Sequence, residues 1–332
     1  MDKVYISRNY PKKFIASTKA KLDAEAIVEG CGFRNVGLRQ INKRGFLGRI
    51  YRQLSIRLGM LRLPPKSILF LQCPNILLMQ QVEAARKKGC TVVILVHDIN
   101  VLRQMSNDSL EPLRIADVLI VHTPAMKQWF VDNGFTQRIE VLQIFDYLTG
   151  DDYTAPRQDM PPVRIAFAGN LGKSKFLSKL SAEKVRYRLF GVGADGLKLN
   201  PGVEYCGCYP PEQLSRHLDS DFGLVWDGTS VDTCDGIEGE YLHYIAPHKT
   251  SMYLSAGIPV IVWDKSAMAG FVRENGVGIA VGSLAEIEKT ISEMSPGEYA
   301  RLKTNAETVG ARLRSGHYLR TILGVIASSS AS

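Results

Sequence analysis

Short apolar, β-branched runs alternate with longer helical stretches along almost the whole chain, and this alternation constrains the fold more than any other feature. In the first half, strand-like runs lie at 4–7, 35–39, 67–72, 91–97, 118–122 and 140–143. The pattern starts again with runs at 163–170, 187–190, 203–205, 222–226, 259–262 and 278–281. Such alternation is typical of mostly parallel sheets covered by helices. The sequence therefore predicts two successive α/β domains.

The segment between the two blocks, 148–162, is polar and rich in proline, which is typical of an interdomain linker. A chain of 332 residues also suits two domains of about 150 residues each. We therefore expect an N-terminal domain at 1–150, a linker at 151–162, and a C-terminal domain with terminal helices at 163–332.

Composition narrows the partners and the location. The net charge of +8 attracts polyanions, but no helix-turn-helix, zinc-finger or RNP pattern accompanies the basic residues, which disfavours nucleic acid. We find no apolar run of about 18 residues and no secretory leader, and so expect a cytoplasmic protein. The six cysteines lack zinc-site spacing, which predicts reduced, structural thiols.

The loop after the first strand of the second block is a candidate ligand site, because ligands bind outside the carboxyl ends of parallel strands. Gly169 and Asn170 are followed there by Lys173 and Lys175. Glycine permits close backbone approach and lysine meets phosphate oxygens, so the segment could cradle a diphosphate. An ordinary turn with solvated lysines stays open, because the P-loop spacing is incomplete.

The sharpest local pattern spans 246–262 and combines a helix start, a glycine break and a buried strand. Lys249 lies in the first turn of the expected helix. A cation there opposes the helix dipole, which points to a bound anion such as phosphate. The alternative is a lysine that faces solvent.

Two titratable residues, His97 and Asp98, end a strongly apolar strand of the first domain. They would lie at the sheet edge that faces the second domain, where either could hydrogen-bond a substrate or deprotonate a hydroxyl group. Asp98 could instead cap a following helix. A further candidate for substrate contact is the loop after the first strand, which contains Ser7, Arg8 and Asn9.

The segment just before the Lys249 helix, 227–240, is strongly acidic. Its spacing fits no calcium-binding loop. We expect no metal there and instead a mobile loop that closes over substrate. Its acidic residues are Asp227, Asp232, Asp235, Glu238 and Glu240.

Several segments together resemble GT-B glycosyltransferases related to family 4. The segment 247–262 is similar to their donor-site helix, and 96–98, 166–170 and 222–226 are similar to one subgroup. That subgroup contains the serine-rich-repeat adhesin glucosyltransferases and β-1,6-galactofuranosyltransferase-like enzymes, and the likeness covers nearly the whole chain in order. It implies a GT-B fold, in which two Rossmann-like domains face each other across a cleft, with the acceptor on the N-terminal and the nucleotide-sugar on the C-terminal domain.

The resemblance also implies an activity, the transfer of a hexose from a UDP-glucose or UDP-galactose type of donor to a glycan, glycoprotein or lipid-linked acceptor. It implies no metal or other cofactor, and self-association of the chain. Met252 stands where many relatives carry a ribose-binding glutamate, and Tyr209 either lies beside the base or is a turn residue. The implied donor-binding residues are Gly169, Asn170, Lys173, Lys175, Tyr209, His248, Lys249 and Ser251, and the implied catalytic residues are His97 and Asp98.

Two other functions remain open for such a chain. A non-catalytic GT-B subunit could bind glycan or stabilise a partner transferase, and the missing ribose glutamate keeps this option. A UDP-sugar 2-epimerase shares the fold but needs carboxylates around the sugar.

A basic helix is expected at 43–62, because no acidic residue occurs from Gly30 to Val82. Apolar side chains recur there at helical spacing with arginines on the flanks, which is typical of helices that lie on anionic membranes. The protein would then be peripheral on the inner face of the plasma membrane. Alternatively, this apolar face packs on the first domain or on another subunit. The apolar residues are Phe46, Leu47, Ile50, Leu54, Leu58 and Leu61.

Overall fold

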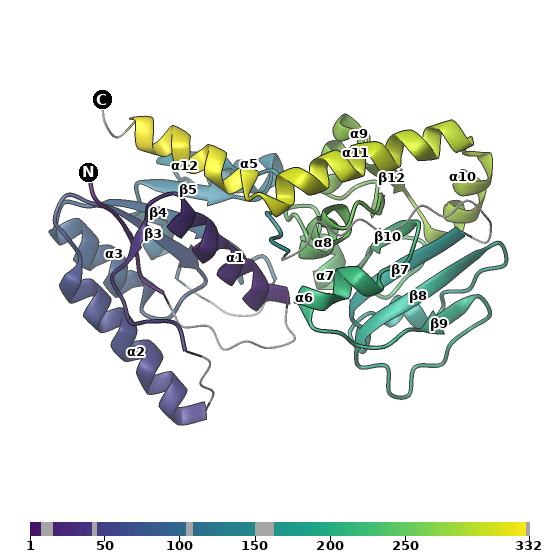
Figure 1. Ribbon diagram of the computed structural model, residues 1–332, viewed down its shortest axis with the longest axis horizontal. Coiled ribbons are helices and arrows are strands. Elements are labelled where there is room, and N and C mark those ends of the chain that lie inside the picture. Colours follow the sequence, from purple (N-terminus) through teal and green to yellow (C-terminus); the bar gives the residue numbers. More distant parts are fainter. Residues whose placement is uncertain (8–15, 42–44, 104–108, 150–162, 330–332) are drawn as a thin grey trace. The chain divides into compact units, whose positions relative to one another are not determined.

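A computed structural model describes residues 1–7, 16–41, 45–103, 109–149 and 163–329 (Figure 1). The chain divides into two compact units. One comprises Met1–Ile144 with His317–Ser332, and the other comprises Phe145–Gly316. The linker expected at 151–162 lies outside the described residues. The last helix belongs to the first unit, although the sequence had suggested that all the terminal helices finish the second.

The first unit contains a six-stranded parallel sheet in the order β2-β1-β3-β4-β5-β6. Each strand-like run of the first block overlaps one of its strands, which confirms the pattern, although the run at 35–39 shares only Asn35 with β2. Their bounds are β1 (Lys3–Tyr5), β2 (Arg34–Asn35), β3 (Ile68–Cys73), β4 (Thr91–Val96), β5 (Val118–Val121) and β6 (Arg138–Val141). The chain reverses its direction of winding between β1 and β3, and ligands bind at such a switch point in parallel sheets.

The helices of the first unit are α1 (Ala16–Gly30), α2 (Gly45–Arg62), α3 (Leu78–Lys87), α4 (Glu111–Arg114), α5 (Pro124–Asp132) and α12 (His317–Ser329). Right-handed crossovers place α1 on one face of the sheet, and α2, α3 and α5 on the other. Helix α12 packs beside α1, where the Arg320 guanidinium lies close to Gly30.

The helices of this unit differ in the residues that precede them. Thr123 caps α5, because its hydroxyl oxygen accepts the Met126 amide at 3.1 Å. Within the described residues α1 begins at Ala16, and α3 begins after Leu77, which has a left-handed backbone and makes no side-chain cap. Hydrogen-bonded turns and no helix follow Asp98 over the described residues 99–103, so the helix expected to begin at Ile99 is not found there.

The second unit contains another six-stranded parallel sheet, in the order β12-β11-β10-β7-β8-β9. All the strand-like runs of the second block are again confirmed. Their bounds are β7 (Val163–Asn170), β8 (Val185–Val192), β9 (Val203–Tyr205), β10 (Phe222–Val225), β11 (Val260–Trp263) and β12 (Gly278–Val281). Taken along the chain this is the Rossmann order 3-2-1-4-5-6, whose switch point lies between β7 and β10.

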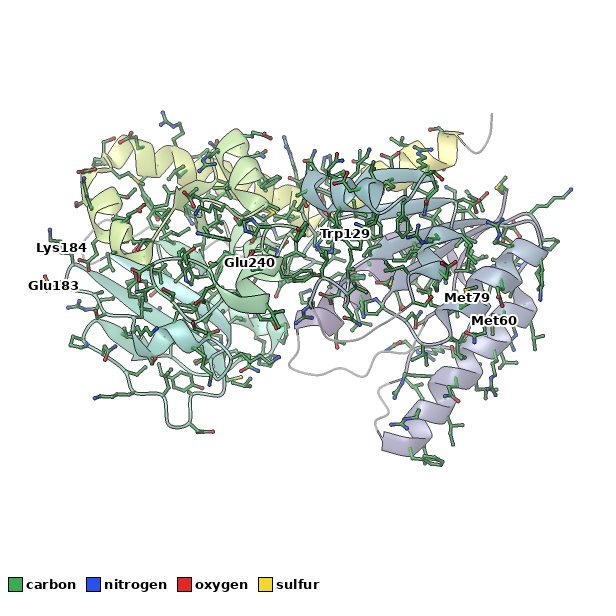
Figure 2. The ribbon with its side chains drawn as sticks, turned by 180° about the vertical axis from the view of Figure 1, so that it is seen from behind. Met60, Met79, Trp129, Glu183, Lys184 and Glu240 are labelled. Atoms are coloured by element: carbon green, nitrogen blue, oxygen red, sulfur yellow. The ribbon has the colours of Figure 1, made fainter. Side chains whose placement is uncertain are left out.

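Helices cover this second sheet and extend beyond it. They are α6 (Pro211–Leu214), α7 (Gly236–Tyr241), α8 (His248–Ser255), α9 (Met268–Asn275), α10 (Ile287–Glu293) and α11 (Pro296–Arg314), with 3-10 helices η1 (Lys175–Ser178), η2 (Ser215–His217) and η3 (Leu284–Glu286). Glu288 of α10 accepts the backbone N–H groups of residues 183–185, which fixes the start of β8; Figure 2 labels Glu183 and Lys184 there.

Helix α8 is held on the second sheet by its buried tyrosine. The Tyr253 ring lies over Gly223 of β10, where an added Cβ would approach it to 2.1 Å. Its hydroxyl oxygen accepts the Ala168 amide of β7 at 2.7 Å. Burial raises the pKa of the Tyr253 phenol, which stays protonated. One side chain therefore sets the position of α8 against the two strands at the switch point.

Candidate functional site

The position of Lys249 defines the candidate site of the second unit. Lys249 lies in the first turn of α8, and its Nζ is 3.1 Å from Oδ1 of Asp227 and 3.5 Å from the Trp226 carbonyl oxygen. The same nitrogen lies 4.6 Å from the ring centroid of Phe167, and an added Cβ at Gly169 would be 3.2 Å from the Lys249 Cε. The lysine therefore bridges the carboxyl ends of β7 and β10.

The contact with Asp227 gives Lys249 a negatively charged partner from the chain itself. The sequence had suggested that a cation in the first turn of a helix requires a bound anion. In the structure a carboxylate of the chain itself supplies the negative charge, and the side chains of Lys249 and Asp227 are 19% and 28% exposed. Lys249 is thus partly open to solvent and already oriented, whereas a role in binding phosphate stays a prediction.

The turn after β7 is compact at its start and open at its end. The Asn170 side chain and carbonyl oxygens both accept the Lys173 amide, at 3.3 and 3.2 Å, and the Ser174 hydroxyl donates to the same carbonyl at 3.1 Å. Lys173 and Lys175 are exposed. This geometry is compatible with both interpretations of the segment, a phosphate-binding loop and an ordinary turn.

Tyr209 is stacked on a residue that the sequence interpretation missed. Its ring lies 3.6 Å from the ring of His217, at an interplanar angle of 10°. Tyr209 is half-buried, His217 is exposed, and η2, which ends at His217, contacts α8. The pair forms a flat aromatic surface beside the Lys249 helix. The nearby histidine could not be found from the sequence, because no recognisable motif joins the two positions.

Two further predicted donor residues on α8 differ in their surroundings. His248 is stacked on Phe145, with ring centroids 5.1 Å apart. Ser251 is completely buried, and its hydroxyl, like that of Thr250, has no hydrogen-bond partner among the described residues. In this structure the Ser251 side chain is therefore closed to solvent, and we do not place it in contact with a donor.

The acidic segment 227–240 is folded around one of its own carboxylates. Asp235 accepts the amides of Thr229 and Ser230 and, at 2.7 Å, the Thr229 hydroxyl, which lowers the Asp235 pKa. Glu238 and Glu240 lie on α7. In the described part of the chain, no group of three or more His, Cys, Asp and Glu side chains could hold a metal ion. Closure of this segment over substrate stays a prediction.

Polar side chains also gather at the carboxyl edge of the first sheet. Ser7, after β1, is buried and lies 2.9 Å from Oε2 of Glu25. His97, after β4, is 7% exposed, and its Nε2 lies 2.7 Å from Oε1 of Gln72 at the end of β3. The switch point between β1 and β3 is therefore lined by groups that can hydrogen-bond a ligand.

The hydrogen bonds of Gln72 fix the tautomer of His97. The Gln72 Nε2 donates to the carbonyl oxygen of Lys21 at 3.2 Å, and a carbonyl oxygen can only accept. The other amide atom, Oε1, therefore faces His97, and the His97 Nε2 must carry a proton. In the neutral ring this leaves Nδ1 as the nitrogen that accepts a proton. The sequence had predicted His97 but not its neighbour.

The structure gives less support to the other predicted site residues of the first unit. Asp98 lies 3.7 Å from Arg103 and is neither buried nor fully exposed. Ser7 is nearly inaccessible at 1% exposure, so its contact with substrate stays a prediction. Arg8 and Asn9 lie outside the described residues.

Solved structures similar to this one identify the fold. The lipopolysaccharide outer core galactosyltransferase WaaB in its apo form matches with a TM-score of 0.63 and 13% identity, over 99% of this chain and 100% of that chain. Anabaena Alr3699/HepE in complex with UDP matches with a TM-score of 0.58 and 13% identity, over 99% and 100%. Two Rossmann-like parallel-sheet domains with these neighbours define the GT-B fold.

Sequence relatives then give the family. The models of the N-terminal and C-terminal domains of glucosyltransferase 3-like proteins match residues 3–144 and 165–326. The β-1,6-galactofuranosyltransferase WbbI of Escherichia coli (strain K12) is 35% identical over 235 residues, 70% of each chain. Glucosyltransferase 3 of Streptococcus gordonii is 28% identical over 242 residues, 70% of this chain and 69% of its own. The chain belongs to the glucosyltransferase 3-like family, which confirms the resemblance noted from the sequence.

Proposed function

We propose that this protein transfers a hexose from a UDP-sugar to a glycan, glycoprotein or lipid-linked acceptor. The observation that carries the proposal is the position of Lys249, which meets the carboxyl ends of β7 and β10 at the switch point of a Rossmann-type sheet. Nucleotides bind at this place in such sheets. The galactofuranosyltransferase and glucosyltransferase relatives, and the neighbour solved with UDP, support the choice of donor.

Lys249 would act on the leaving group. When the bond between the anomeric carbon and the diphosphate oxygen breaks, its electron pair goes to the diphosphate, and a fixed ammonium group stabilises that charge. The first-turn amides of α8 add to the positive field. We propose that these groups suffice without a metal ion, and that Asp227 holds the lysine in place until the donor arrives.

Tyr209 and His217 would hold the nucleotide base, uracil. Uracil can stack on a flat aromatic surface, and the two rings already lie parallel at 3.6 Å. The contact between η2, which ends at His217, and α8, which carries Lys249, supports a nucleotide bound with its base on one group and its diphosphate on the other.

His97 would serve as the base if the reaction inverts the anomeric centre. The acceptor hydroxyl would give its proton to the His97 Nδ1 while its oxygen attacks the anomeric carbon. Gln72 supports this role, because it holds the proton on Nε2 and leaves Nδ1 to accept. Asp98 would then hydrogen-bond the transferred sugar rather than act as the base.

A non-catalytic subunit is the second candidate function, and Met252 favours it. This residue is 6% exposed and stands where related enzymes carry a glutamate that binds ribose. A UDP-sugar 2-epimerase is less well supported, because Asp227 is the carboxylate in contact with Lys249 and it is already paired. Self-association and a peripheral location at an anionic membrane complete the proposal.

The test is a panel of UDP-, GDP- and dTDP-sugars, incubated with the protein in buffer with EDTA and in buffer with added Mg²⁺. We expect slow release of UDP from one UDP-sugar, equal in both buffers. Binding without release of any nucleotide would favour the non-catalytic subunit, and an epimerised donor sugar would favour the epimerase. Absence of binding to every member of the panel would contradict the transferase and the epimerase, and would favour a subunit that binds glycan or a partner transferase.

A further inference from the structure

Helix α2 presents an apolar face that the rest of the described structure leaves uncovered. Figure 1 shows α2 beside α3, on the far side of the sheet from α1. The exposed fractions of its large apolar side chains are Phe46 74%, Leu47 68%, Ile50 46%, Leu54 47% and Leu61 75%. The alternative in which this face packs on the first domain is therefore wrong for these five residues.

The helix packs on its domain through the opposite side. Its buried residues are Gly48, Ser55, Ile56 and Gly59, and an added Cβ at Gly59 would approach Ile6 to 2.9 Å. At about 100° per residue, the buried positions and the exposed apolar positions fall on opposite arcs of the helix. The apolar face thus points directly away from the domain.

The charged side chains of α2 are all positive. At helical spacing Arg57 falls within the apolar face, and Arg49 and Arg62 fall on either side of it. All three are exposed, and no acidic residue occurs from Gly30 to Val82. A second copy of the chain docking by the same face would bring these arginines together, because a two-fold interface pairs identical patches. A surface that is apolar within and negative at its border complements the face better.

A shallow groove at the C-terminal end of α2 likewise combines apolar and basic side chains. It is lined by three apolar residues, Met60, Leu61 and Ala84, and by three basic ones, Arg57, Lys87 and Lys88. Lys88 donates to the carbonyl oxygens of Met60, Leu61 and Leu63 at 3.0, 3.0 and 2.8 Å, so it fixes the end of α2 against α3. In Figure 2 the labels Met60 and Met79 mark the two helices near this groove.

We propose that α2 and the adjoining groove form a docking surface for an anionic phospholipid membrane. The five exposed apolar side chains enter the interface between headgroups and acyl chains, and Arg49, Arg57, Arg62 and Lys87 meet lipid phosphates. This deepens the peripheral location proposed above by naming the surface, and it does not depend on the donor site of the other unit. The described residues contain no helix long and apolar enough to cross a membrane.

The experiment is flotation of the full chain with vesicles of phosphatidylglycerol and phosphatidylcholine, compared with vesicles of phosphatidylcholine alone. We expect binding to the mixed vesicles that weakens as salt rises, and at least tenfold weaker binding to phosphatidylcholine. The double variant Phe46→Ser, Leu47→Ser should lose at least tenfold in affinity for the mixed vesicles, as should Arg49→Glu with Arg57→Glu. The matched control is Val131→Ser, which removes an apolar side chain of 47% exposure from α5.

Absence of binding to the mixed vesicles, or equal binding by wild type and both double variants, would overturn the proposal. A double apolar variant that changes the molecular mass in solution and leaves vesicle binding intact would show that the face joins copies of the chain, and would overturn it too. UDP-sugar binding by the same variants separates this outcome from the proposed function, since neither double variant touches the Lys249 site.

Discussion

At the scale of single residues, the hydrogen bonds of Gln72 are what give His97 a defined chemistry. An imidazole at a sheet edge can carry its proton on either nitrogen, and only one arrangement lets Nδ1 accept a proton. The Lys21 carbonyl oxygen accepts the Gln72 amide, which leaves the Gln72 oxygen facing His97 and selects the tautomer with the proton on Nε2. Gln72 is therefore a positioning residue of the proposed reaction.

We predict that Gln72→Leu raises the population of the Nδ1-protonated tautomer of His97. The substitution removes the hydrogen bond that favours a proton on Nε2, and transfer should fall about tenfold or more through kcat rather than KM. Nitrogen-15 NMR of the imidazole ring reads the tautomer directly. Gln128→Leu, on the exposed side of α5, is the control and should leave ring and rate unchanged. A Gln72→Leu protein with wild-type ring shifts would refute the positioning role.

A second buried histidine should make the first unit sensitive to acid. His122 is 3% exposed and its Nε2 contacts the Val96 carbonyl oxygen at 2.9 Å. Burial lowers its pKa from 6.5 to about 4. Between these values the unfolded chain binds a proton that the folded chain does not, so stability falls as the pH falls from about 6.5 to about 4.

We predict that wild type loses roughly 2 kcal/mol more unfolding free energy than His122→Gln between pH 7 and pH 5. The variant lacks the group that takes up the proton on unfolding, so this part of the pH dependence should vanish. Urea unfolding at the two pH values measures the difference. Equal losses in the two proteins would show that His122 is not the source.

At the scale of elements, α8 and the two strands beneath it act as one assembly. Tyr253 reaches from α8 to the Ala168 amide, and Gly223 makes room for its ring. Lys249 lies on the same helix, so its place at the strand ends depends on this packing. A change that lifts α8 should therefore disturb both stability and donor binding.

We predict that Gly223→Ala lowers the unfolding free energy by about 1–3 kcal/mol, because the new methyl group would overlap the Tyr253 ring. UDP-sugar affinity should fall with it. Gly270→Ala is the matched control, since nothing lies within 4 Å of an added Cβ there and alanine favours the α9 helix by up to about 1 kcal/mol. Thermal unfolding and a binding titration test both variants. Equal stability of the two would contradict the packing described for α8.

The elements also show what could be predicted from the sequence and what could not. The predicted runs overlap every strand of both sheets. The match is best for buried strands such as β4 and β10, because buried parallel strands are nearly continuous in apolar residues, and it is poorest for β2, which shares only Asn35 with its run. The start of α8 and the position of Lys249 followed from the Pro247 boundary. The Asp227 contact, the His217 stack and the Gln72 bond join residues distant in sequence, so no local pattern could reveal them.

The apolar residues of α2 illustrate a different limit. Helical spacing correctly grouped Phe46, Leu47, Ile50 and Leu54 on one face. Spacing cannot say whether such a face is covered, because a core helix and a surface helix can share the pattern. Only their exposure in the structure, from 46% to 74%, separated the two alternatives.

At the scale of the whole molecule, the chain contains two parallel sheets, each with a switch point lined by polar side chains. The first offers Ser7, Gln72 and His97, and the second offers Lys249 with Asn170 and the Tyr209–His217 pair. In the proposed function of this GT-B protein, the first unit carries out the proton transfer and the second unit binds the nucleotide-sugar.

The most direct test of this division is calorimetric titration of UDP, and of the UDP-sugar found by the panel, into wild type, Lys249→Ala and Lys184→Ala. Lys184 lies directly before β8, at the end of that strand opposite to its carboxyl end, and controls for the loss of one positive charge. We predict that Lys249→Ala weakens binding at least tenfold, because a charge-assisted bond to the diphosphate contributes about 1.5–3 kcal/mol. Lys184→Ala should bind as wild type does. Equal affinity of all three proteins would contradict the assignment of the donor site to the second unit's switch point.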